Sequence, residues 1–232
     1  MTFDTASRPG TAHSPAPMPM GHTLPHAPAP DDTAALARRV RDLLVPYDLV
    51  IVPGLHDSGP LHWQSRWQAL LPSRRVRQAD WDRPTYDAWA RGLERTLARC
   101  HRPVIFAAHS LGAVLVARWG TQQARTPVAG AFLVAPADLH GPRARQVPGL
   151  ARDFAPPAPT ALPFATRVIA SGNDEWLSPA RARAFATQWG ARLLPAGAQG
   201  HLGNSSAVGA WAQGLRWLAE FIETLPPTHT GP

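Results

Sequence analysis

The segment 104–119 constrains the fold more than any other part of the chain, because an apolar run passes through Ala-His-Ser-Leu-Gly into a stretch rich in alanine and valine. The apolar run predicts a buried strand, and the stretch after it is compatible with a helix. A serine between two such elements is typical of a nucleophile elbow, a sharp turn that presents its hydroxyl at the carboxyl end of a sheet. The usual pattern is Gly-x-Ser-x-Gly, and Ala108 stands at its first glycine. Because alanine adds only a methyl group, we still expect the elbow at Ser110.

Strand patterns alternate with helix patterns along the rest of the chain. In addition to the strand before Ser110, strands are expected at 48–54, 76–79, 128–134, 166–171 and 192–194. In addition to the helix after Ser110, helices are expected at 31–44, 85–99, 179–189 and 208–225. Such alternation predicts an α/β fold, with a mostly parallel sheet covered by helices on both faces.

The length of the chain suits one domain with a tail. Its 232 residues, of which 44% are hydrophobic, can bury a sizeable core, and we assign the domain to 31–225. Residues 1–30 are rich in Pro, Ala, His, Ser and Thr and contain almost no large aliphatic side chains, so we expect a disordered tail. Residues 226–232 are expected to be a frayed end.

The net charge of +7 raises the question of a nucleic-acid partner. All 23 basic residues are arginines, and they are scattered along the chain without forming a basic helix or a stripe interleaved with aromatic residues. We interpret them as a compositional bias and expect no nucleic-acid binding.

Cysteine and histidine usage bears on compartment and cofactors. Cys100 is the only cysteine, which excludes an internal disulfide framework and favours a reducing cytoplasm. No apolar stretch is long enough to span a bilayer and no signal-peptide core is present, so no membrane association is expected.

No cluster has zinc-site spacing, and we interpret His13, His22 and His26 as solvated tail residues. We therefore expect no metal and no other cofactor.

Two further residues complete a catalytic arrangement with Ser110. Asp174 follows a predicted strand, and His201 follows the last predicted strand in a glycine-rich loop. Both would lie at the carboxyl edge of the sheet, and the chain order Ser, Asp, His is that of nucleophile-elbow hydrolases. Asp138, which follows another strand, is the alternative acid. His109 adjoins the serine and is interpreted as a packing residue of the elbow.

An oxyanion formed at Ser110 needs two hydrogen-bond donors. We expect one to be the backbone amide of Leu111 and the other that of Leu55, with His56 as the alternative. Aromatic residues near this edge could line a substrate pocket. The candidates for substrate binding are His56, Trp63, Trp81 and Trp176.

These motifs occur in the same order in a family of small serine hydrolases, the YdeN-like proteins and retinoblastoma-binding protein 9. The chain resembles that family in Val52-Pro53-Gly54, His62-Trp63, the His-Ser-x-Gly elbow, Ser171-Gly172-Asn173-Asp174 and Gly200-His201. The run 55–67 and the stretch 201–214 resemble the bacterial members in particular. The resemblance covers about residues 48–223. Two positions depart from the family pattern, namely Ala108 in the elbow and Glu175, where a proline often follows the acid.

The resemblance implies a compact α/β-hydrolase fold without a large lid, and a triad of Ser110, Asp174 and His201. Together with the residue pattern, it predicts a metal-independent hydrolase that cleaves small carboxylic esters through an acyl-enzyme. The small-molecule substrate could instead be an amide or peptide, since an aminopeptidase activity is attributed to the animal protein. A binding protein that retains the fold is the rival interpretation, and the completeness of the triad argues against it.

Overall fold

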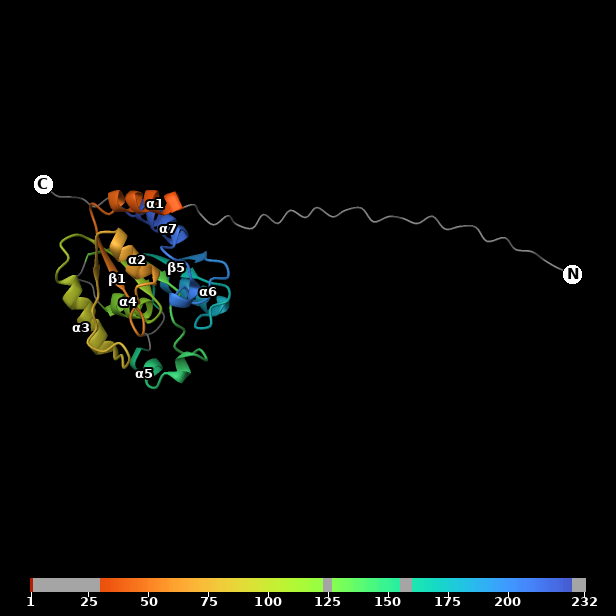
Figure 1. Cartoon of the computed structure of the whole chain (residues 1–232). Coiled ribbons are helices and arrows are strands. Elements are labelled where there is room, and N and C mark those ends of the chain that lie inside the picture. The colour runs from red at the N-terminus through yellow and green to blue at the C-terminus, as the bar shows by residue number, and fades with distance from the viewer. Residues whose placement is uncertain (2–29, 123–126, 155–159, 227–232) are drawn as a thin grey trace.

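Six parallel strands form one sheet in the order β2-β1-β3-β4-β5-β6 (Figure 1). The computed structural model describes residues 1, 30–122, 127–154 and 160–226. The strands are β1 Asp48–Val52, β2 Ser73–Arg75, β3 Val104–His109, β4 Val128–Val134, β5 Ala165–Ala170 and β6 Arg192–Pro195. Most of the expected disordered tail (1–30) and frayed end (226–232) lies outside the described residues, namely 2–29 and 227–232, whereas Pro30 begins α1.

Helices cover both faces of the sheet, as the alternating pattern predicts (Figure 1). The helices are α1 Pro30–Leu43, α2 Trp63–Leu70, α3 Tyr86–Leu97, α4 Leu111–Gln122, α5 Leu150–Phe154, α6 Pro179–Trp189 and α7 Ala212–Glu223. The side chains of α3, α4, α5 and α6 share one core cluster, and those of α1, α2 and α7 share the other. Within the described residues, only the 3-10 turn Ala144–Gln146 and α5 lie between β4 and β5, so no large lid covers the sheet edge.

Alternation along each strand divides its side chains between these two cores. In β1, Val50 and Val52 pack with α3 and α4, whereas Leu49 and Ile51 pack with α1, α2 and α7. Successive side chains of a strand point to opposite faces, so a strand buried on both faces is apolar throughout. This is the reason why β1, β3 and β4 were recognisable as continuous apolar runs.

The edge strand β2 differs from its prediction. It spans Ser73–Arg75 rather than 76–79 and pairs with β1 through Leu49 and Ser73. An edge strand keeps part of its surface in solvent, so arginines are tolerated there and the apolar signal is lost.

Three helices also differ from the expectation, and the short helix α5 is one of them, because no helix was predicted between β4 and β5. The last helix begins at Ala212 rather than near 208, because Gly209 and Trp211 adopt positive φ values of 63° and 51°. Helix α2 was not predicted, since its buried residues include Gln64 and its N-cap is His62 rather than a common capping residue.

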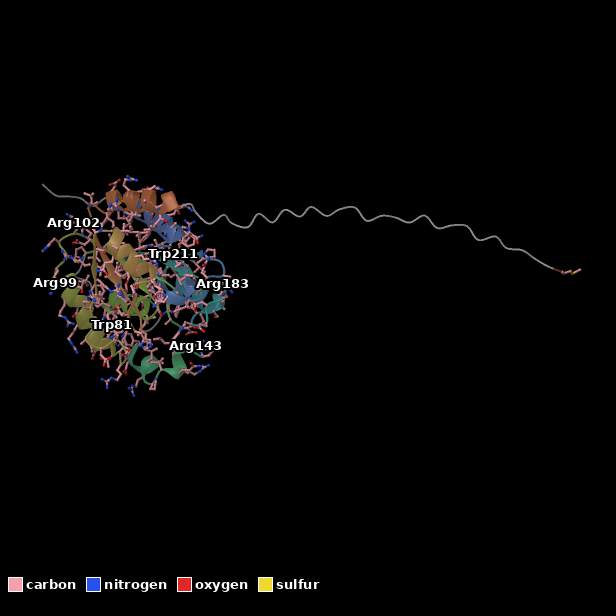
Figure 2. The ribbon with its side chains drawn as sticks, viewed as in Figure 1. Trp81, Arg99, Arg102, Arg143, Arg183 and Trp211 are labelled. Atoms are coloured by element: carbon pink, nitrogen blue, oxygen red, sulfur yellow. The ribbon has the colours of Figure 1, made fainter. Side chains whose placement is uncertain are left out.

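Arginine side chains lie on several sides of the domain, with Arg99 and Arg102 on one side and Arg183 on the other (Figure 2). Across the described ranges, none of the helices combines the length and the apolar character that crossing a membrane requires.

Candidate active site

Ser110 occupies a strained turn between β3 and α4. Its φ of 54° lies in the left-handed region, which non-glycine residues rarely adopt and which a nucleophile elbow requires. The Ser110 amide donates a hydrogen bond to the Val134 carbonyl at 3.0 Å, and the Ser110 carbonyl accepts one from the Ala113 amide at 3.0 Å. The turn is therefore fixed on the strand side and on the helix side.

Two glycines allow β1 and the elbow to approach each other closely. A Cβ on Gly112 would lie 2.3 Å from the carbonyl oxygen of Pro53, and a Cβ on Gly54 would lie 2.8 Å from Cβ of Ser110. Such short contacts exclude any larger residue unless the backbone shifts. Ala108, at the first glycine of the usual elbow pattern, is fully buried in the core without disturbing this turn.

A chain of hydrogen bonds joins Ser110, His201 and Asp174. Oγ of Ser110 lies 2.8 Å from Nε2 of His201, and both carboxylate oxygens of Asp174 lie 2.9 Å from Nδ1 of His201. The Asp174 side chain is fully buried, and that of His201 is 15% exposed. Because a carboxylate only accepts, the proton of a neutral His201 ring sits on Nδ1, and Nε2 accepts from the serine hydroxyl.

Asp138, the alternative acid, has different partners. Its Oδ2 lies 3.2 Å from Nε of Arg181, and its Oδ1 accepts a hydrogen bond from the His140 amide at 3.1 Å. The structure thus places Asp174, and not Asp138, in contact with His201.

The loops that carry Asp174 and His201 are tied to each other by Asn173 and Ser171. Oδ1 of Asn173 accepts from the Ser171 hydroxyl at 2.8 Å and from the Gly200 amide at 2.7 Å. Oγ of Ser171 accepts from the Gln199 amide at 2.8 Å. The Ser-Gly-Asn-Asp motif therefore does more than locate the acid, because its serine and asparagine hold the histidine loop in place.

Two aromatic side chains donate hydrogen bonds to the backbone of the loop that carries His201. Nε2 of His109 donates to the His201 carbonyl at 2.8 Å, and Nε1 of Trp63 donates to the Leu202 carbonyl at 3.0 Å. Trp63 is fully buried, so its interpretation as a substrate-binding residue is wrong. This contact could not be predicted from local sequence patterns, since Trp63 and Leu202 are far apart in the chain.

His62 and His109 are buried beside Ser110 and have low pKa values. Burial, with a smaller contribution from the Arg75 charge, lowers the pKa of His62 to about 3. Burial also lowers the pKa of His109 well below 6.5. Nδ1 of His62 accepts from the Gln64 amide at 3.1 Å, which places the proton of its neutral ring on Nε2. Both rings are therefore neutral at pH 7.

The two residues whose amides are predicted to bind an oxyanion line the cavity in front of Ser110. Leu111 and Leu55 both line that cavity, and neither amide has a hydrogen-bond acceptor within the part of the chain that the structure describes. The alternative choice of the His56 amide is wrong, because that amide donates to the Trp81 carbonyl at 3.2 Å.

Gln64 fixes the loop that carries Leu55. Its Nε2 donates to the Val52 carbonyl at 3.1 Å and the Ala107 carbonyl at 2.9 Å, and its Oε1 accepts from the Ser58 hydroxyl at 2.6 Å. The side chain is fully buried between the ends of β1 and β3. Gln64 was not predicted as a functional residue, because its signal in the sequence is only that of a polar residue next to Trp63.

A cavity of about 340 Å³ opens over Ser110 and His201. Its apolar side is formed by Leu55, Leu111, Ala137, Leu150 and Trp176. Its polar side includes His56, Asp57, Glu175, Asn204 and Ser205.

The remaining pocket candidates take different positions around this cavity. Trp176 lies beside the His201 ring with a centroid separation of 5.7 Å. His56 lines the rim, where its Nδ1 lies 2.8 Å from Asp82. Trp81 packs edge-on against Trp89 rather than lining the cavity.

Glu175, the departure from the family pattern, forms an ion pair with Arg143 at the rim of the cavity. Both side chains are about half exposed, so the pair contributes little to stability. In the described ranges, no group of three or more His, Cys, Asp or Glu residues is placed to hold a metal ion.

The parallel sheet, the elbow and the residues at its carboxyl edge define an α/β hydrolase. The model of the serine hydrolase family matches residues 49–220, and the chain therefore belongs to that family. No curated protein matches the sequence.

Solved structures agree with this assignment. A protein described as a YdeN-like hydrolase, from Pectobacterium atrosepticum, has 33% sequence identity and a TM-score of 0.73, covering 83% of this chain and 100% of that one. The ydeN gene product from B. subtilis has 18% identity and a TM-score of 0.63, covering 77% of this chain and 100% of that one. Est1E from Butyrivibrio proteoclasticus shares the fold at 11% identity, with a TM-score of 0.60 and coverage of 76% and 88% of the two chains. The chain is thus a YdeN-like small serine hydrolase.

Proposed function

We propose that this serine hydrolase cleaves small carboxylic esters through an acyl-enzyme on Ser110. The observation that carries the proposal is the hydrogen-bonded chain from Ser110 through His201 to Asp174. A serine hydroxyl is a weak nucleophile until a neutral base takes its proton, and the base needs an acceptor that fixes its tautomer.

The steps follow from this geometry. Oγ of Ser110 attacks the ester carbonyl while its proton moves to Nε2 of His201, and the Leu111 and Leu55 amides stabilise the oxyanion. The tetrahedral intermediate collapses, the carbon–oxygen bond breaks, and Nε2 returns the proton to the leaving alcohol. A water molecule then gives a proton to Nε2 of His201 and attacks the acyl carbon; the bond between that carbon and Oγ of Ser110 breaks, Nε2 returns the proton to Oγ, and the carboxylic acid leaves. Asp174 orients the ring and stabilises its cationic form without taking up the proton.

The size and lining of the cavity support small substrates. A volume of about 340 Å³ lies near the lower end of the range of roughly 300–1,000 Å³ that ligand sites occupy. Leu55, Leu150 and Trp176 offer an apolar surface to an acyl chain, and the open rim leaves room for the alcohol.

A substitution at the nucleophile tests the proposal. Ser110→Ala should lower kcat/KM for a short-chain ester by about a thousandfold or more, because only the oxyanion donors and binding remain. Wild-type protein treated with a fluorophosphonate should gain the mass of one adduct on Ser110, and the alanine variant should gain none. An adduct elsewhere, or a variant that retains a tenth of the activity, would contradict the assignment.

The alternatives separate in the same assay. An ester and an amide of one acyl group, measured side by side, distinguish an esterase from an amidase or peptidase. A binding protein that merely retains the fold would neither turn over the ester nor react with the fluorophosphonate.

A further inference from the structure

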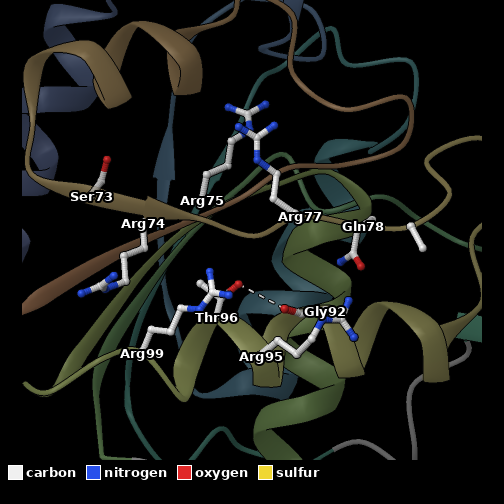
Figure 3. A pocket seen from close by; sticks show the side chains of 10 residues that line it. Ser73, Arg74, Arg75, Arg77, Gln78, Gly92, Arg95, Thr96 and Arg99 are labelled. Carbon is white, nitrogen blue, oxygen red and sulfur yellow. Dashed lines mark hydrogen bonds between the residues drawn. The ribbon is translucent and has the colours of Figure 1, made fainter.

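A second cavity, of about 460 Å³, lies between the edge strand β2 and helix α3 (Figure 3). Five of its ten lining residues are arginines and none is acidic. It shares no lining residue with the cavity over Ser110. In the strand register, Arg74 of β2 lies opposite Val50 of β1, and Val50 lies opposite Phe106 of β3. Arg74 is thus two strands away from β3, at the level of a residue that precedes Ser110 by four positions. The arginine cavity is therefore separate from the candidate active site.

The arginines divide into two sets across β2. Arg75 and Arg77 point away from α3, and Arg75 pairs with Asp57 and donates to the Ser58 carbonyl at 2.8 Å (Figure 3). Arg95 and Arg99 come from the α3 side of the cavity, one helical turn apart in the sequence (Figure 3). Alternation along the strand places Arg74 on the face opposite to Arg75.

The second set, Arg74, Arg95 and Arg99, forms no ion pair with any residue that the structure describes. Nε of Arg74 is buried and has no hydrogen-bond partner among those residues. A buried donor without an acceptor costs free energy, which a bound anion would offset.

An adjoining cavity extends the basic surface around the sheet edge. It shares Ser73 and Arg74 with the first and adds Arg41 and Arg102, but it also contains Asp48. The Asp48 carboxylate already accepts hydrogen bonds from the His101 and Arg102 amides, at 2.7 and 2.9 Å. The cavity between β2 and α3 has no such carboxylate and is therefore the stronger anion site.

We propose that this cavity binds a small molecule that carries two or more phosphate groups, held by Arg74, Arg95 and Arg99. A guanidinium offers several donors in a planar fork that matches phosphate oxygens, and it remains charged at any physiological pH. Three unpaired guanidinium groups carry more positive charge than one carboxylate of a ligand can neutralise, so a ligand with several negative charges fits better. The cavity volume of about 460 Å³ suits a ligand of that size.

Calorimetric titration of the full chain with pyrophosphate at low ionic strength tests the proposal. Arg95→Gln combined with Arg99→Gln should weaken pyrophosphate binding by about tenfold or more, since each charge-assisted hydrogen bond is among the stronger ones in proteins. The matched control is Arg183→Gln combined with Arg192→Gln, two exposed arginines of which Arg192 belongs to β6, the edge strand opposite β2, and Arg183 belongs to α6. The control should bind pyrophosphate as the wild type does.

Two results would overturn the proposal, namely an absence of pyrophosphate binding and an equal loss of binding in the test and control variants. If the protein that does not bind pyrophosphate binds a single-stranded oligonucleotide, the cavity belongs to a nucleic-acid surface instead. Arg95 and Arg99 are exposed, so their replacement should leave circular dichroism and ester hydrolysis unchanged, which separates this test from that of Ser110.

Discussion

Two aspartates at the carboxyl edge of the sheet have different partners. Asp174 contacts Nδ1 of His201 with both carboxylate oxygens and is fully buried, whereas Asp138 lies beside Arg181. The sequence favoured Asp174 through its chain order with Ser110 and His201, but it left Asp138 as an alternative because each aspartate follows a strand. What separates them is a contact between residues 27 positions apart in the chain.

Replacement of each aspartate by asparagine should therefore have unequal effects. Asp174→Asn keeps the shape of the side chain but favours the wrong tautomer of His201, and such a change can lower kcat by about 10⁴. Asp138→Asn should leave kcat within a few-fold of the wild type, because its partners lie outside the hydrogen-bonded chain. Steady-state hydrolysis of one short-chain ester by both purified variants checks this expectation. A larger loss at Asp138 would transfer the role of acid to that residue.

The packing of helix α4 against the end of strand β1 positions the nucleophile Ser110. Gly112 makes this contact possible, since a Cβ there would lie 2.3 Å from the carbonyl oxygen of Pro53. Gly120 lies in the same helix, but a Cβ there would meet the far end of the Phe164 ring, at 2.6 Å. A backbone carbonyl cannot move without moving β1, whereas a ring can rotate.

The two glycines provide a matched pair of substitutions. Gly112→Ala should push α4 away from β1, lower the free energy of unfolding by about 1–3 kcal/mol and reduce kcat. Gly120→Ala should cost less, because alanine favours the helix by roughly 1 kcal/mol over glycine and offsets part of the contact. Urea unfolding together with ester kinetics measures both effects. Equal losses of kcat in the two variants would contradict a positioning role for this contact.

Buried neutral histidines make the stability of the whole molecule sensitive to acid. His62 and His109 pack against each other with ring centroids 4.7 Å apart, and burial lowers both pKa values, that of His62 to about 3. In the unfolded chain a histidine has a pKa of about 6.5. Below that pH the unfolded state binds a proton that folded His62 does not, so the free energy of unfolding falls as the pH falls from 6.5 towards 3.

Substitution of His62 should weaken this dependence. His62→Asn retains a side-chain acceptor for the Gln64 amide but does not titrate, so the loss of stability on acidification should be smaller by up to about 1.4 kcal/mol per pH unit below 6.5. Urea unfolding at a series of pH values between 7 and 4 gives the two slopes. Parallel slopes for variant and wild type would show that His62 is not neutral in the folded protein at low pH.

Local patterns in the sequence determined the class of fold and most of the candidate site. The apolar runs of β1, β3 and β4 identified strands because both faces of these strands are buried. Parallel strands end at one edge of a sheet, so the residues that follow β3, β5 and β6 could be placed together without a structure. Ser110, Asp174 and His201 were predicted together in this way, and the structure brings Ser110 and Asp174 each within hydrogen-bond distance of His201.

The tertiary structure alone decided which side chains support the candidate active site and which arginines lie together in one cavity. Hydrogen bonds to backbone carbonyls distant in the sequence are donated by the side chains of Trp63, His109 and Gln64. A local sequence pattern does not reveal such partners. Arg74 and Arg99 belong to separate segments that appeared scattered, yet β2 and α3 bring them to one cavity. Local periodicity reflects which face of an element is buried, whereas the contact partners depend on how the elements pack.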